Sequence, residues 1–210
     1  MKINFNSIKI TLNKIRSKHS QSLDEFDFKV LNSILKNNYK FNKTNKLLNE
    51  ELDFNLCLYI SQLFNYESEN KLKWLIKAET KYNDNCEEKY LYLLNFNIGK
   101  YYYFHNVFDF KTNNLDTARK YFYFCKDKIP NSLYYLGCIA LIKQMSINIK
   151  NRDYRESYHY FKLAVDNNIN EAISQEKLTK NLVIKSSFKN GDIKEIGETM
   201  NWINSFNKKN

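Results

Sequence analysis

The sequence has very few residues of the kinds that form tight turns. It contains 4 glycines and 1 proline among 210 residues. Antiparallel sheets need such residues at the corners between their strands, so the shortage argues against a β-rich fold. With 43% hydrophobic and 16% aromatic residues, the chain has enough apolar side chains to form a core, which argues against wholesale disorder. Helices joined by asparagine-rich turns fit this composition best.

Several kinds of functional motif are also missing. The 4 cysteines form no CxxC pair and no zinc-ligand spacing, and we interpret each as standing in an apolar helical stretch, like a buried free thiol in a reducing compartment. They are Cys57, Cys86, Cys125 and Cys138. None of the 3 histidines belongs to a metal-ligand motif, and the glycines are too scattered for a phosphate-binding loop. We therefore expect no catalytic residue, no metal site and no cofactor, and a protein that is not an enzyme.

No run of apolar residues is long enough to cross a bilayer. The first 20 residues lack the continuous apolar stretch of a secretory signal, which predicts a cytoplasmic protein and leaves organelle import and specialised export open. Residues 1–20 contain no acid and form a basic segment, interpreted as a flexible tail, a first helix or a presequence. The net charge of +10 favours an anionic partner such as nucleic acid, or else reflects AT-rich coding.

A pattern of small and aromatic residues recurs along the chain. Residues 118–125 (ARKYFYFC) and 157–164 (SYHYFKLA) both follow the order small-x-x-aromatic-aromatic-x-x-small, 39 positions apart. Residues 71–78 (KLKWLIKA) form a third copy, in which Lys71 replaces the first small residue. Positions i, i+3, i+4 and i+7 share one face of an α-helix, so each copy predicts a helix that packs through its small residues.

Two glycines recur at nearly the same period. Gly99 and Gly137 stand 38 positions apart, each inside a helix-like stretch. Glycine in a helix costs about 1 kcal/mol relative to alanine, so its presence needs a reason. We expect that the absence of Cβ lets a partner helix pack against the backbone. Together the two periods indicate a repeat of two helices.

These residues resemble the Sel1-like repeats, a branch of the tetratricopeptide-like solenoids. Ser132, Leu136 and Gly137 match the first helix of that repeat, and the motif at 157–164 matches the second. Asn168 takes the place of the glycine that usually ends the second helix, which predicts a left-handed backbone conformation there. The residues expected to form the repeat core are Trp74, Ala78, Gly99, Ala118, Tyr121, Phe122, Leu136, Gly137, Tyr160, Phe161, Ala164 and Ala172.

The resemblance implies an all-α fold, an α-solenoid of antiparallel helical hairpins with about four repeats. The repeat domain is expected over 51–206, with hairpins at 51–80, 87–127, 131–166 and 170–206. Residues 21–50 form a capping region before the repeats. It contains an amphipathic helix predicted over 23–37.

The resemblance further implies a protein-binding scaffold or adaptor that uses the concave face of the solenoid. Helical period alone places the following residues on that face: Tyr92, Asn95, Tyr102, Tyr103, Tyr134, Tyr135, Lys143 and Glu176. The alternative is a basic helical repeat that binds RNA or DNA. Repeats that read single bases use polar residues at equivalent positions of every unit, and no such repeated pair is evident here.

Overall fold

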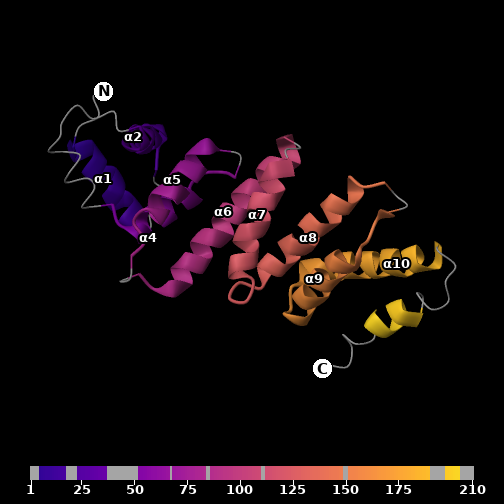
Figure 1. Cartoon of the computed structure of the whole chain (residues 1–210). Helices are drawn as coiled ribbons and strands as arrows, with labels where there is room; N and C mark the ends of the chain where they lie inside the picture. The colour runs from indigo at the N-terminus through magenta and orange to yellow at the C-terminus, as the bar shows by residue number, and fades with distance from the viewer. Residues whose placement is uncertain are drawn as a thin grey trace. The chain divides into compact units, whose positions relative to one another are not determined.

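The chain is all-α. A computed structural model describes residues 5–17, 23–36, 52–66, 68–83, 86–109, 112–148, 151–189 and 197–203 (Figure 1). Every regular element among these residues is a helix and none is a strand, which confirms the predicted all-α class. The chain divides into two units, Met1–Phe110 and Lys111–Asn210. The boundary falls inside the range that sequence analysis treats as one repeat domain, between the two helices of the hairpin expected at 87–127.

The described residues of unit 1 form five helices, each of which packs on at least one other. Their bounds are α1 (Phe5–Arg16), α2 (Glu25–Leu35), α4 (Phe54–Gln62), α5 (Glu69–Glu79) and α6 (Glu88–Asp109). Helix α1 packs on α2, and α5 contacts α2, α4 and α6 (Figure 1). Helices α4 and α5 both lie within the hairpin predicted at 51–80. Helix α1 lies within the basic N-terminal segment, so this segment is helical over 5–16.

A buried carboxylate joins α1 to α2. Asp27 accepts hydrogen bonds from Thr11 Oγ1 at 2.5 Å and from Lys14 Nζ at 2.7 Å. It also forms a capping box with Asp24, in which each side chain accepts from the other's backbone amide. Burial alone would raise the pKa of Asp27. The hydrogen bonds from Lys14, Thr11 and the Asp24 amide outweigh burial, so the pKa lies below its usual value.

Unit 2 consists of helices that pack in chain order. Their bounds are α7 (Thr112–Cys125), α8 (Asn131–Met145), α9 (Arg155–Asp166), a short 3-10 helix η3 (Asn170–Ala172) and α10 (Ile173–Lys189). Residues 197–203 are also helical. Helix α8 packs on α7 and α9, and α9 packs on α10 (Figure 1). The hairpin predicted at 131–166 thus corresponds to α8 and α9.

A close approach between two helices of unit 2 involves Gly137. A Cβ added at this residue would lie 2.8 Å from Cδ1 and Cε1 of Phe161, inside ordinary van der Waals contact. Ser157 Oγ donates a hydrogen bond of 3.1 Å to the Gly137 carbonyl. The glycine of α8 and the aromatic and small residues of α9 therefore meet in one helix contact. All the residues expected in the repeat core are buried except Tyr121, which is half-buried.

The turn after α9 confirms the prediction for Asn168, whose φ is 63°. The Asn168 amide donates to the Val165 carbonyl at 2.9 Å and the Ile169 amide to the Ala164 carbonyl at 3.0 Å. These two bonds form a Schellman motif, which satisfies carbonyl groups at the end of the helix.

The cysteines differ from the sequence interpretation in part. Cys57 and Cys125 are buried free thiols, and burial raises the pKa of both, to about 11 for Cys57. Cys138 lies in α8 but is half-buried. Cys86 lies before α6 and outside any helix, which corrects the interpretation that all four stand in helices.

Candidate binding sites

Unit 1 contains a cavity of about 590 Å³, here called the Lys71 cavity. The end of α4 and the turn after it form one side, the start of α5 contributes Lys71, and α6 forms the other side. On α6, Asn97 and Phe104 are seven residues apart and so share one helix face. The lining residues are Gln62, Phe64, Asn65, Tyr66, Lys71, Asn97 and Phe104.

Lys71 is a buried lysine whose ammonium group caps the end of α4. Its side chain is held by hydrogen bonds from Nζ to the Ser61 carbonyl at 3.2 Å and the Phe64 carbonyl at 3.0 Å. The Nζ atom also lies 4.0 Å from the centre of the Tyr66 ring. Helix ends leave carbonyl groups that need donors, and a lysine suits this position because it also complements the helix dipole. This contact explains why a lysine replaces the small residue of the repeat motif.

A second lysine stands beside the same aromatic ring. Lys100 Nζ lies 4.6 Å from the centre of the Tyr66 ring, and 5.7 Å and 6.0 Å from those of Phe96 and Phe104. The Tyr66 hydroxyl donates to Asn97 Oδ1 at 3.1 Å, which fixes the ring against α6. One tyrosine ring is therefore in contact with two ammonium groups from different helices.

The Lys71 cavity is electropositive. Burial and, to a smaller extent, the nearby charge of Lys100 together lower the pKa of Lys71 to about 8. Burial also lowers the pKa of Lys100. None of the described lining residues is an acid. With its pKa near 8, Lys71 is still mostly charged at neutral pH, so this charge belongs to the cavity wall.

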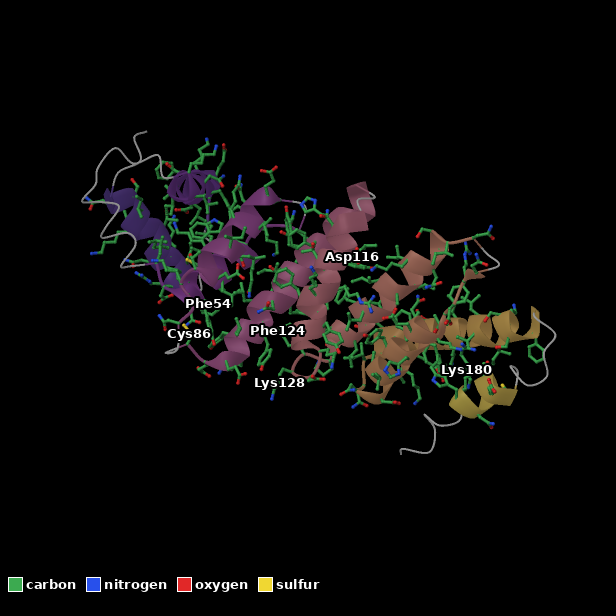
Figure 2. The ribbon with its side chains drawn as sticks, in the orientation of Figure 1. Phe54, Cys86, Asp116, Phe124, Lys128 and Lys180 are labelled. Carbon is green, nitrogen blue, oxygen red and sulfur yellow. The ribbon has the colours of Figure 1, made fainter. Side chains whose placement is uncertain are left out.

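Unit 2 contains a smaller cavity of about 380 Å³, here called the Tyr123 cavity. It is formed by the ends of α7 and α9 and the start of α8. Figure 2 labels Phe124 and Lys128, which mark the end of α7 where Tyr123 lies. The lining residues are Tyr123, Lys126, Asp127, Leu133, His159, Tyr160, Leu163 and Asn167.

The Tyr123 cavity joins a buried aromatic wall to an exposed aromatic rim. Tyr160 of the repeat motif is 9% exposed, whereas Tyr123 is 57% exposed. Lys126 Nζ lies 4.9 Å from the centre of the Tyr123 ring and pairs with Asp127 at 3.0 Å. Burial lowers the pKa of the half-buried His159, against the charge of Glu156, so the imidazole is mainly neutral at pH 7. The cavity thus offers apolar surface with polar groups at its edge.

The residues that helical period places on a binding face lie elsewhere. Tyr92, Asn95, Tyr102 and Tyr103 are on α6 in unit 1, and Tyr134, Tyr135, Lys143 and Glu176 are on α8 and α10 in unit 2. All eight are half-buried, and none lines either cavity.

Two of these tyrosines pack against the repeat core. The Tyr135 ring stacks on Phe122, with ring centres 4.8 Å apart, and the Tyr134 ring lies 5.8 Å from that of Phe161. Burial raises the pKa of Tyr134 to about 12. Lys143 pairs with Asp116 of α7. Tyr134, Tyr135 and Lys143 thus each contact a neighbouring helix. Their place on a concave binding face stays a prediction.

Sequence reasoning singled out two of the cavity residues, Lys71 and Tyr160, but neither of them as a binding residue. Lys71 was visible as the lysine that replaces a small residue in the repeat motif. No departure from a motif marks Tyr66, Lys100 or Asn97 in the sequence. They approach one another only because the turn after α4 packs on α6. Tyr123 and His159 occupy variable positions of the motif, which its small-x-x-aromatic pattern does not constrain.

Two further observations concern the described residues only. No group of three or more histidine, cysteine or acidic side chains there is arranged to hold a metal ion. No helix in this part of the chain combines the length and apolar character needed to cross a membrane.

When compared with family models, with curated proteins and with solved structures, the chain matches none of them. The resemblance to Sel1-like repeats therefore rests on the quoted residues.

Proposed function

We propose that this protein is a helical-repeat scaffold or adaptor, an α-solenoid of about four hairpins that binds a partner protein. The repeat pattern supports this proposal because its small and aromatic positions are used for packing. The second aromatic position of two copies, Phe122 and Phe161, is fully buried, as is Leu75 in the third. Apart from the fully buried Tyr158, the positions between them are exposed or half-buried. Repeat proteins present binding faces from such positions.

The single observation that carries the proposal is the Tyr123 cavity. Tyrosine is enriched at the energetic centres of protein interfaces, because its ring offers a large contact area and its hydroxyl group a polar end. Here an exposed tyrosine stands at the mouth of a cavity with a buried aromatic wall. We propose that an apolar side chain of the partner enters this cavity and contacts Tyr123 and Tyr160.

The test is affinity purification from native cells after mild crosslinking, with and without nuclease, read by mass spectrometry. The wild-type chain is compared with Tyr123→Ala. We expect a set of proteins that survives nuclease and is depleted by this substitution. Truncating a residue at the centre of an interface costs about 2 kcal/mol or more, which corresponds to a weakening of at least about tenfold.

Phe188→Ala is the matched control. Phe188 is an aromatic residue of α10 with 58% exposure, nearly that of Tyr123, and it does not line the cavity. It should retain the captured proteins. Equal loss in both variants would contradict the role of the cavity. Loss of every captured protein after nuclease would instead favour the alternative, in which the charge of +10 serves to bind RNA or DNA.

A further inference from the structure

The Lys71 cavity carries positive charge in a wall that otherwise consists of aromatic rings and side-chain amides. Buried lysines are normally paired with an acid, because an isolated buried charge is costly. Lys71 is instead held by two carbonyl groups and a tyrosine ring, which hydrogen-bond its protons without neutralising its charge. Lys100 does not line the cavity itself, but its Nζ adds a second positive charge beside two rings that do, those of Tyr66 and Phe104. The described wall therefore favours an anion.

We propose that the Lys71 cavity binds a small organic anion, whose charged group lies beside Lys100 and whose apolar, ring-sized part lies against Phe64 and Phe104. This inference goes beyond the partner-binding function, because it concerns another unit and another class of ligand. It does not depend on the Tyr123 cavity.

The two lysines have different tasks in this proposal. The donors of Lys71 are committed to carbonyl groups and the Tyr66 ring, so Lys71 acts through its fixed charge. The Lys100 ammonium contacts ring faces, and a hydrogen bond to an anionic oxygen is the stronger interaction. Lys100 is therefore the group that contacts the anion. The exposed amides of Gln62 and Asn65 lie at the rim and supply further donors.

The volume and lining of the cavity define the class of ligand. At about 590 Å³ it lies within the range of small-molecule sites, roughly 300–1,000 Å³. Its rings provide contact area for an apolar body. An ammonium group acts as a point charge that accepts carboxylate and phosphate alike, so the charged group is either of these. Benzoate and phenyl phosphate represent the two sources, and each carries a ring of suitable size.

Isothermal titration calorimetry of the full chain tests the proposal with these two probes. At least one of them should bind, and inorganic phosphate and benzyl alcohol should each bind at least about tenfold more weakly, because each supplies only half of the contacts. Benzoate alone would identify a carboxylate ligand and phenyl phosphate alone a phosphate ester. Failure of both probes to bind overturns the proposal and leaves the partner-binding test unaffected.

Variants separate a specific site from general attraction to a basic protein. Lys100→Met keeps most of the apolar stem and should weaken binding about tenfold or more through loss of the charge-assisted hydrogen bond. Lys73→Met is the control, because Lys73 is an exposed lysine of α5 that pairs with Glu69. It should leave the affinity unchanged. Equal effects of the two substitutions, or no effect of Lys100→Met, would overturn the proposal.

Proton uptake gives a second readout. A bound anion stabilises the charged form of Lys71 and raises its pKa from about 8, so binding near pH 8 should take up protons. The measured heat will then depend on the ionisation enthalpy of the buffer. Binding whose heat is the same in HEPES and Tris buffers at pH 8 would show that the anion is not near Lys71.

Discussion

Replacement of Gly137 by leucine should destabilise unit 2. Gly137 lies in α8 against Phe161 of α9, which is fully buried. A Cβ alone would stand 2.8 Å from two ring carbons, where ordinary contacts are about 3.5–4.0 Å. The ring has little room to retreat, because its other face belongs to the core of the unit. Leucine adds three more carbon atoms in the same direction.

The expected magnitude follows from two opposing effects. Leucine has the higher helix propensity, which returns up to about 1 kcal/mol. Overpacking of a closed core costs typically about 1–3 kcal/mol, and more when several atoms must be accommodated. We expect a net loss of about 1–3 kcal/mol in the free energy of unfolding. The Tm should then fall by roughly 2–8 °C for each kcal/mol, depending on whether the two units unfold together.

Thermal and urea unfolding, followed by circular dichroism, measure this loss. Gly197→Ala is the control, because an added Cβ there meets nothing within 4 Å. A double-mutant cycle with Gly137→Ala and Phe161→Leu should show that the smaller side chain relieves part of the strain. An unchanged Tm in Gly137→Leu would refute the contact between α8 and α9 through Gly137, and with it the proposed repeat register.

Two further predictions concern the helix ends. Because the pKa of Asp27 is lowered in the folded state, its contribution to the stability of unit 1 is complete above its unfolded pKa and is lost as the pH falls through the lowered value. Asp27→Asn should reduce this dependence of stability on pH. Urea unfolding between about pH 2 and pH 6 measures it, a range set by the ordinary Asp pKa of about 3.9. The same dependence in wild type and Asp27→Asn would contradict this role of Asp27. At Asn168, with φ of 63°, Asn168→Ala should cost about 1 kcal/mol and Asn168→Gly should be neutral or stabilising. Thermal unfolding of the pair measures the difference, and equal Tm values would argue against a left-handed turn.

The local features of the fold could be predicted from the sequence because they depend on residues near one another in the chain. Scarce glycine and proline with small and aromatic residues at i, i+3, i+4 and i+7 indicate helices. The left-handed turn at Asn168 follows from the place of this asparagine in the repeat that the sequence resembles. The residues of the candidate sites could not be predicted in this way. Helical period gives the direction of Tyr134 and Tyr135 about their own helix, but whether another ring covers them depends on where the next helix lies.

The sequence by itself determined the all-α class and the helical stretches, because backbone propensity and side-chain period are local properties. It also predicted the positive φ of Asn168, through the resemblance to a known repeat. Only the tertiary structure decided what Lys71 does. In sequence it is a lysine that breaks a motif, and in the fold its ammonium group caps α4 and shares the Tyr66 ring with Lys100. These groups come from separate helices, and their charges interact because packing brings them within a few ångströms in a site shielded from water.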